Sequence, residues 1–366
     1  MSSVISGAHE IGLSAAVRAM GETADVAAPD MAALQGRAAD VPVLDAPHLD
    51  NTEIERLLAK QSGWHSVAGA TIRVTGPLRS NGFSRIYRGE GGMFPCPVAI
   101  KQFLWDPSGA SPAESARTYF HGLQTMADAA RRVDLGATEP YALLEAYGIV
   151  VSSWVDGPTL EKSLFRGSAA RRRILTHDAG VWLARLHTAC GLQYRTPDIA
   201  GMLDRLESEL AKRTDGTGLG RHGLRLLRTA GAALAGQPVP WSCHYGDFKP
   251  ANLIVRDGRL VAIDVELVSC APTVNDAAHF LNHVQLGLYS PRAMRRWGEP
   301  SLLAELFCRG YADAAGERLP HDLLQWQRLY NAMFLMSQHR EWCRSPMAWP
   351  MQLTLRRLVR TLCGPL

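Results

Sequence analysis

Three polar residues in one short segment could together handle a metal ion and a phosphate group. They are Asp247, Asn252 and Asp264. An amide oxygen and a carboxylate oxygen suit Mg2+, which takes its remaining ligands from a polyphosphate and water. Asp247 lies in a tight loop five residues before Asn252, where its carboxylate could accept the proton of an attacking hydroxyl group. The spacing predicts an ATP-dependent phosphotransferase, with Asp247 catalytic and with Asn252 and Asp264 binding Mg2+.

The predicted local fold supports this interpretation. Aliphatic residues lie on both sides of Asp257-Gly258, which is the preferred dipeptide of a two-residue β-hairpin turn. The register of that hairpin places Asn252 opposite Ile263. Asn252 and Asp264 are therefore expected to meet at its open end. The alternative is a surface hairpin whose carboxylates only cap turns.

A lysine upstream could hold the phosphates. Residues 97–101 form an apolar strand that ends in Lys101, and they match the strand whose lysine pairs with nucleotide phosphates and with a helix glutamate in kinases. Glu114 is the only glutamate between Lys101 and Glu139, and it begins a helix predicted over residues 112–131. Glu114 is thus the candidate partner of Lys101. Its alternative role is that of a first-turn acid that stabilises the helix dipole.

Two further segments are predicted to contact the nucleotide. Strands over residues 71–78 and 85–89 flank a loop in which the backbone amides of Gly82, Phe83 and Ser84 could cradle phosphate. A hinge is predicted over residues 152–157, with the adenine expected at the backbone near Ser153 to Val155.

These elements, in this order, resemble the aminoglycoside phosphotransferase family over roughly residues 65–345. The matching segments are Asn81–Ser84, Val98–Lys101, Trp154–Leu160, Leu183–His187, Gly246-Asp247 and Ile263-Asp264. The resemblance implies an α+β, bilobal, protein-kinase-like fold with a small β-rich N-lobe and a mainly helical C-lobe. It also implies ATP and Mg2+ as cofactors and a small-molecule or glycolipid acceptor.

The sequence departs from that family at one position beside the predicted base. Family members usually have His two residues before the catalytic Asp, whereas this chain has Tyr245 there. A catalytically inactive, nucleotide-binding pseudokinase or scaffold is therefore kept as an alternative. A protein kinase is a second alternative, although the short interval between Asp264 and Asp276 has no room for a long activation segment.

Composition predicts the domain organisation and the compartment. The 366 residues are 46% hydrophobic and 20% charged, which suits a two-domain enzyme without a membrane span. We expect an N-terminal extension over residues 1–50, partly disordered, an N-lobe over 51–151 that begins with a helix, and a hinge and C-lobe over 152–366. The N-terminus lacks a basic region followed by a continuous apolar core, which predicts a cytoplasmic protein. The seven cysteines are an odd number without a Cys-x-x-Cys pair, which predicts reduced thiols.

Charge is the only guide to the acceptor. From residue 291 onward there are eleven Arg, no Lys and six acidic residues. This balance favours a neutral or anionic acceptor over a polycation, while the overall charge of +4 does not indicate nucleic acid. The Arg-rich helix expected over residues 353–362 suggests peripheral membrane contact, or else a solvated helix face.

Two other patterns have a common structural explanation. His279 and His283 have helical metal-ligand spacing, but core or surface histidines are more common at that spacing. The tryptophans at positions 297, 326, 342 and 349 could line an acceptor pocket or belong to the core.

Overall fold

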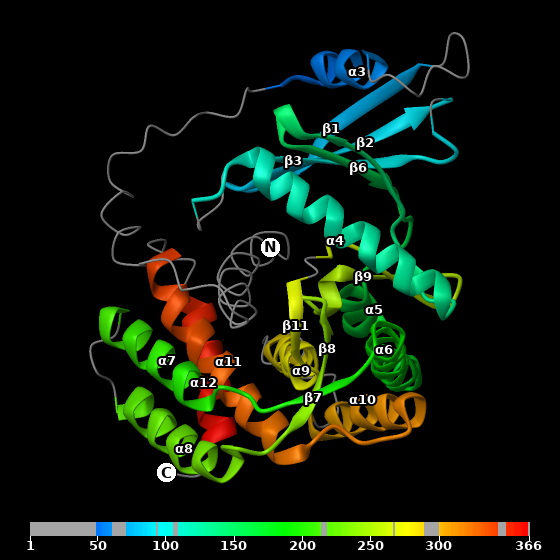
Figure 1. Cartoon of the computed structure of the whole chain (residues 1–366). Helices are drawn as coiled ribbons and strands as arrows, with labels where there is room; N and C mark the ends of the chain where they lie inside the picture. The colour runs from blue at the N-terminus through cyan, green and yellow to red at the C-terminus, as the bar shows by residue number, and fades with distance from the viewer. Residues whose placement is uncertain are drawn as a thin grey trace. The chain divides into compact units, whose positions relative to one another are not determined.

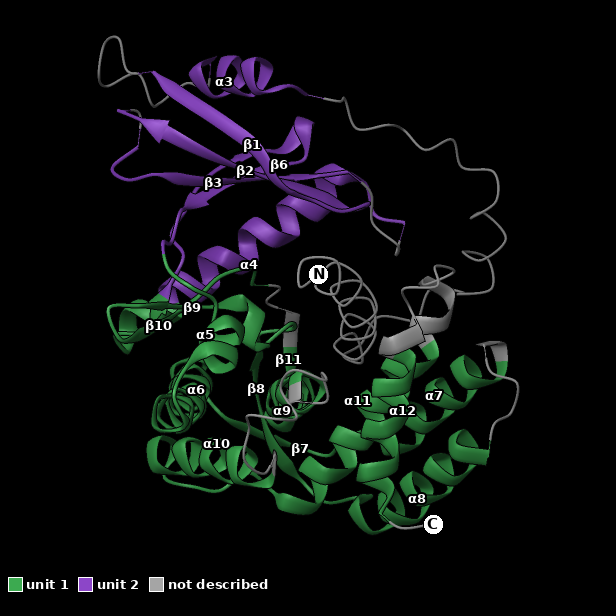
Figure 2. Ribbon diagram, turned by 180° about the vertical axis from the view of Figure 1, so that it is seen from behind, with its two compact units in different colours: residues 1–22, 129–136, 157–366 green, residues 23–128, 137–156 purple. Residues whose placement is uncertain are grey.

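The chain divides into two compact units, which Figure 2 colours separately. The structure, a computed structural model, describes residues 49–60, 71–92, 94–104, 109–213, 218–265, 268–288, 300–342 and 349–364. One unit comprises residues 23–128 and 137–156, and the other comprises residues 1–22, 129–136 and 157–366. The predicted extension over residues 1–50 lies outside the described residues, except for its last two.

The first unit is built on an antiparallel sheet of five strands in the order β1-β2-β3-β6-β5 (Figure 1). Its strands are β1 (Ile72–Ser80), β2 (Ser84–Gly91), β3 (Val98–Phe103), β5 (Pro140–Leu144) and β6 (Ile149–Ser153). Its other elements are α3 (Asn51–Lys60), α4 (Pro112–Arg132), whose last turn passes into the second unit, and the 3-10 turn η1 (Glu145–Tyr147).

The predicted first helix, α3, packs on this sheet. Ile54 and Leu58, one turn apart, are fully buried in a cluster with residues of β1 and β3. The helix begins with a reciprocal pair: the Glu53 amide donates to the Asp50 carboxylate, and the Asp50 amide donates to the Glu53 carboxylate. Asp50 therefore caps the helix.

The second unit is mainly helical (Figure 1). Its helices are α5 (Leu160–Arg166), α6 (Ala169–Cys190), α7 (Ile199–Arg213), α8 (Gly218–Leu234), α9 (Val274–Leu288), α10 (Pro300–Ala315), α11 (His321–Trp342) and α12 (Trp349–Cys363). Its strands are β7 (Gln193–Arg195), β8 (Val239–His244), β9 (Leu253–Arg256), β10 (Arg259–Ala262) and β11 (Val268–Pro272), with the 3-10 turn η2 (Pro250–Asn252) and β4 (Gly136–Ala137) beside β10.

Glycine allows α6 and α10 to approach each other closely. A Cβ atom added at Gly180 of α6 would lie 2.1 Å from the carbonyl oxygen of Phe307 on α10. A Cβ atom at Gly310 of α10 would lie 2.1 Å from the carbonyl oxygen of His177 on α6. The two backbones are thus in contact, and any larger residue at either position would separate them.

The predicted hairpin is confirmed. Strands β9 and β10 pair around a turn in which both Asp257 and Gly258 have positive φ, 49° and 81°, as a type I′ turn requires. Arg256 pairs with Arg259, which is the register expected from the sequence.

The last helix, α12, buries its apolar side against the protein. Leu355, Leu358 and Val359 are almost fully buried, whereas Arg357 and Arg360 are exposed. Within the described residues, no helix combines the length and the hydrophobicity that crossing a bilayer would demand.

Candidate active site

The hairpin brings the two predicted metal ligands to one place. The Ile263 amide donates to the Asn252 carbonyl oxygen across a distance of 3.0 Å, which fixes the two strands together just before Asp264. Asp264 then adopts a left-handed backbone conformation with φ of 56°, which Asp tolerates better than most residues. The chain therefore turns sharply directly after Ile263.

Asp247 is buried and holds three hydrogen bonds through its carboxylate. Oδ2 accepts from Nζ of Lys249 at 2.5 Å and from Nδ2 of Asn252 at 2.8 Å. Oδ1 lies 2.9 Å from Nε2 of His279, which donates to it. Burial alone would raise the pKa of Asp247, but the Lys249 charge and the His279 hydrogen bond outweigh burial and lower it to about 2. Asp247 is therefore ionised at neutral pH.

His279 reaches Asp247 from α9 as a neutral donor. Burial lowers the pKa of His279, despite the opposing effect of the neighbouring Asp247 carboxylate. Its Nδ1 is buried and has no hydrogen-bond partner in the described part of the chain. Nε2 therefore carries the proton that the carboxylate accepts.

The residues at the hairpin suit a hard divalent cation. The Asn252 amide nitrogen donates both to the backbone oxygen of Asp247 and to its carboxylate. Because both donors are used there, the side-chain oxygen of Asn252 is directed away from Asp247 and can act as a ligand. This oxygen and the Asp264 carboxylate form the donor set that Mg2+ binds when a polyphosphate supplies further oxygens.

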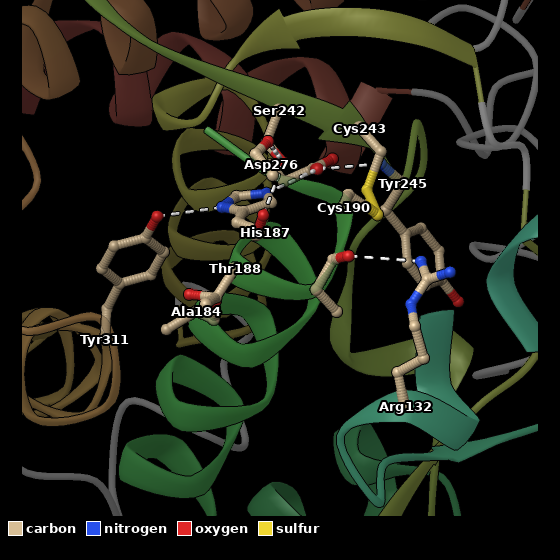
Figure 3. Close-up of a disulfide and its surroundings, with 12 residues drawn as sticks. Arg132, Ala184, His187, Thr188, Cys190, Ser242, Cys243, Tyr245, Asp276 and Tyr311 are labelled. Carbon is tan, nitrogen blue, oxygen red and sulfur yellow. Dashed lines mark hydrogen bonds and ion pairs between the residues drawn. A yellow bond between two sulfur atoms is a disulfide. The ribbon is translucent and has the colours of Figure 1, made fainter. Parts of the chain in front are cut away.

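A second buried carboxylate, that of Asp276, holds the backbone directly before Asp247, which is called the catalytic loop below (Figure 3). It accepts from the amide of Tyr245 at 2.9 Å and from the amide of Gly246 at 3.2 Å. Nε2 of His244 lies 3.1 Å from one carboxylate oxygen, and Nε2 of His187 on α6 lies 3.6 Å from the other. Burial would raise the pKa of Asp276, but these two histidines outweigh it and hold the pKa well below its usual range.

Tyr245, which stands where the family usually has His, also supports the predicted metal site. Its buried hydroxyl is directed at the carbonyl oxygens of Ile263 and Asn252, with the shorter contact to Ile263. The ring packs edge-on against Trp182 and Phe248. A tyrosine here thus ties together the two backbone segments that carry the predicted metal ligands.

The prediction of reduced thiols is wrong for two of the seven cysteines. Cys190, at the end of α6, and Cys243, on β8, form a disulfide, with their Cα atoms 5.8 Å apart (Figure 3). They lie 53 residues apart in the sequence, so no local spacing indicates the pair. Four cysteines, at positions 96, 270, 308 and 363, are free, and Cys343 lies outside the described residues.

In the other unit, Lys101 lies against aromatic rings. Its ammonium nitrogen is 4.2 Å from the centre of the Tyr119 ring and 5.0 Å from that of Phe103. The carboxylate of Glu114, its predicted partner, accepts instead from the amide and hydroxyl of Ser111, while the Glu114 amide donates to the Ser111 hydroxyl. This is a capping box at the start of α4, so the structure favours the alternative role of Glu114.

The predicted phosphate loop has its amides engaged by a side chain. The amides of Phe83 and Ser84 both donate to the side-chain oxygen of Asn81, at 3.0 Å and 2.7 Å. Gly82, by contrast, has no atom near the position of a Cβ. These two amides are thus satisfied within the loop, and a phosphate that used them would have to displace the Asn81 oxygen.

The predicted hinge also has some of its backbone donors in use. The amide of Ser153 donates to the Glu139 carbonyl oxygen, and the amide of Trp154 donates to the Pro97 carbonyl oxygen, both at 2.8 Å. An adenine at this segment would therefore contact the carbonyl oxygen of Ser153 or the backbone of Val155. The contacts predicted at Ser153 and Val155 stay predictions.

Sequence reasoning missed two direct neighbours of Asp247. Lys249 could have been recognised as a cation two residues from the predicted base. His279 was considered only as half of a metal pair with His283, and among the described residues no cluster with a third ligand exists. Its bond to Asp247 spans 32 residues, so it depends on the placement of α9.

For Trp326, the structure favours a place in the core over a place in an acceptor pocket. Trp326 is 3% exposed, donates to the backbone oxygen of Leu227 and stacks on Tyr330, so it belongs to the core. The side chains of the other three tryptophans, at positions 297, 342 and 349, lie outside the described residues.

Comparisons with known proteins identify the family and agree with the fold. Residues 103–319 match the Phosphotransferase enzyme family. The fold is similar to an amicoumacin kinase solved with AMP-PNP, Ca2+ and Ami, with 13% identity, coverage of 78% of this chain and 87% of that one, and a TM-score of 0.55. A glucosamine kinase solved with glucosamine, ADP and inorganic phosphate gives 15% identity, coverage of 84% and 85%, and a TM-score of 0.55.

A choline kinase from Streptococcus pneumoniae gives 14% identity, coverage of 84% and 98%, and a TM-score of 0.53. No curated protein matches the sequence. The predicted α+β, protein-kinase-like fold and the resemblance noted in the sequence are both confirmed.

Proposed function

Because the chain belongs to the phosphotransferase enzyme family, we propose that it transfers the γ-phosphoryl group of ATP to a hydroxyl group of a small molecule. The observation that carries this proposal is the buried, ionised Asp247, whose carboxylate is held by Lys249, Asn252 and His279. A carboxylate fixed in this way is suited to orient a hydroxyl group for attack.

Asp247 acts mainly by orientation. A carboxylate offers about four lone-pair positions, and three bonds from the protein leave room for one hydroxyl donor. A pKa of about 2 makes Asp247 a weak base, and phosphoryl transfer through a loose transition state needs little base strength. The hydroxyl proton would pass to Asp247 as the acceptor oxygen forms its new P–O bond and the P–O bond to the leaving ADP breaks.

The remaining predicted residues bind the nucleotide and the metal. Asn252 and Asp264 would hold Mg2+, which when bound neutralises charge on the phosphate oxygens. Lys101 positions the phosphates, and the backbone of residues 82–84 covers them once Asn81 gives up its two bonds. The backbone at Ser153 and Val155 receives the adenine.

The acceptor is a neutral or anionic sugar, alcohol or glycolipid headgroup, as the Arg excess after residue 291 favours. One of these arginines, Arg328, is buried and donates to the side chains of Asn282 and Gln285, so part of the excess serves the core. The structural neighbours named for glucosamine and choline indicate that this fold also accepts amines. A substrate panel must therefore contain both chemical classes.

Two predictions concern where the protein is found: contact with a membrane surface, and a cytoplasmic location. Most of the apolar side of α12 is buried, so the residues available for contact with an anionic membrane are Leu353, which is 49% exposed, and exposed arginines such as Arg357 and Arg360. A cytoplasmic location stays a prediction, and a disulfide such as Cys190–Cys243 is uncommon in that compartment.

The decisive experiment compares the purified wild-type protein with Asp247→Asn, which is isosteric and avoids leaving the Lys249 charge beside an empty space. We expect a loss of turnover of at least about 100-fold, with Mg-ATP affinity within about threefold of wild type. Turnover is measured with ATP and with GTP, against sugars, amino alcohols, aminoglycosides and lipid-linked saccharides. Thermal unfolding of both proteins checks that the variant is folded.

The same panel separates the alternatives. Nucleotide binding without any turnover that depends on Asp247 would favour a pseudokinase. Labelling of casein, or of the chain itself, would favour a protein kinase. An Asp247→Asn variant with wild-type turnover would contradict the proposed role of Asp247.

A further inference from the structure

The lysine of β3 faces the inner side of α4. Lys101 pairs with Val150 of β6 and Ile86 of β2 within the sheet, and its ammonium nitrogen lies 4.2 Å from the centre of the Tyr119 ring of α4. Tyr119 is 8% exposed. Phe103, two residues along β3, meets Tyr119 edge-on at 5.5 Å and lies 5.0 Å from the same ammonium nitrogen.

The acidic residues of α4 lie on its other side. The helix contains two, Glu114 and Asp128, and both are exposed. Successive residues of an α-helix are rotated by about 100°, so Glu114 points about 140° away from Tyr119. The residues of α4 that are buried with Tyr119 include Ser115 and Ala116 but no acid. Glu114 is in addition occupied by the capping box with Ser111.

We propose that Tyr119, supported by Phe103, is the positioning residue for Lys101, in the place where a helix carboxylate would otherwise hold the lysine. This inference rests on the proposed function, because it assumes that Lys101 binds nucleotide phosphates. It concerns the holding of Lys101 alone and does not involve the acceptor.

The physical argument lies in the distance and the burial. A cation within about 6 Å of an aromatic centre is attracted by the ring, and the attraction strengthens when water is excluded. The buried ring of Tyr119 meets both conditions. A ring also restrains the ammonium group without cancelling its formal charge, as a carboxylate would.

The test measures the affinity of the full-length protein for Mg-ATP and for ADP by calorimetry, which needs no knowledge of the acceptor. We expect Tyr119→Leu to weaken both affinities by about three- to thirtyfold, the range given by a cation–π contact. Tyr119→Phe keeps the ring and should stay within about twofold of wild type. In a Lys101→Met background, Tyr119→Leu should cause no further loss, because the group that it positions is gone.

Two further variants exclude a merely structural effect. Tyr141 is a tyrosine of the same unit that pairs with Phe94 at 5.5 Å, so Tyr141→Leu should lower the melting temperature while leaving nucleotide affinity unchanged. Glu114→Gln should also leave the affinity unchanged, whereas an ion pair with Lys101 would make it weaken binding as strongly as Lys101→Met does.

The possible failures can be told apart. A wild-type protein that binds no nucleotide would overturn the proposed function and this inference with it. If Lys101→Met weakens binding but Tyr119→Leu binds as wild type, the inference alone is overturned. It is equally overturned if Tyr119→Leu weakens binding to the same extent in the presence and absence of Lys101.

Discussion

Tyr245 joins two backbone segments through its hydroxyl group, at a position where the family usually has His. Its hydroxyl is directed at the backbone oxygens of Ile263 and Asn252, which lie next to the predicted metal ligands. We expect Tyr245→Phe to lower stability by about 1–3 kcal/mol, because a buried hydrogen-bond donor is lost while its acceptors remain. The variant should also need more Mg2+ for half-maximal turnover, as measured by Mg2+ titration at saturating ATP.

The matched control is Tyr330→Phe. Tyr330 is also buried, but it stacks between Trp326 and Phe334 of α11. This change should affect stability and leave the Mg2+ requirement at the wild-type value. An unchanged Mg2+ requirement in Tyr245→Phe would mean that the tyrosine serves only packing.

The site residues divide by how local their signal is. Asp247, Asn252 and Asp264 lie in one short segment. The Asp257-Gly258 turn fixes the register of the hairpin between the last two, so this register could be predicted from the sequence alone. His279 and Asp276 contact the loop from about 30 residues away. Their roles depend on which side of α9 faces the loop, and one sequence carries no direct signal for that.

At the level of elements, the bounds of a helix follow from the local sequence, whereas the side of the helix that faces a given residue does not. The strong periodicity and Ser-Pro start of α4 allowed its bounds to be predicted within one residue. A count of glutamates names Glu114 as the candidate partner of Lys101, but it does not show on which side of the helix that residue lies. Glu114 is on the exposed side, where capping rather than ion pairing is available to it.

The close contact between α6 and α10 predicts the effect of a glycine substitution. Gly180→Ala should destabilise the protein by at least about 2 kcal/mol, because the new Cβ would meet the backbone oxygen of Phe307 at 2.1 Å and neither helix backbone can move independently. Denaturant unfolding measures the change. Gly218→Ala, where the new Cβ meets no atom within 4 Å, should leave stability unchanged or raise it by up to about 1 kcal/mol.

If Gly180→Ala proves as stable as wild type, the backbones of α6 and α10 are not in direct contact at Gly180. Since His177 also lies on α6, substitution of the second contact glycine, Gly310→Ala, would repeat the test from the α10 side. The two substitutions together should be less than additive, because either one alone already separates the helices.

At the level of the whole molecule, the disulfide joins two elements that also meet at the Asp276 network. Cys190 ends the helix that carries His187, and Cys243 precedes His244. Both histidines contact Asp276, which holds the amides of the catalytic loop. The disulfide thus fixes the end of α6 to β8, next to the two histidines that contact Asp276.

The last prediction follows from the length of chain that the disulfide closes. With a sequence separation of 53 between Cys190 and Cys243, loop-closure entropy amounts to about 4 kcal/mol at most, and about 2–4 kcal/mol is usual. Cys190→Ser with Cys243→Ser should therefore lose about 2–4 kcal/mol of unfolding free energy, and reductant should then have no further effect. Thiol titration of the unfolded wild type should rise by two groups on reduction, whereas Cys308→Ser, which removes a free cysteine, should keep that rise. If reduction yields no additional thiols, Cys190 and Cys243 are already reduced in the isolated protein, as the cysteine count predicts.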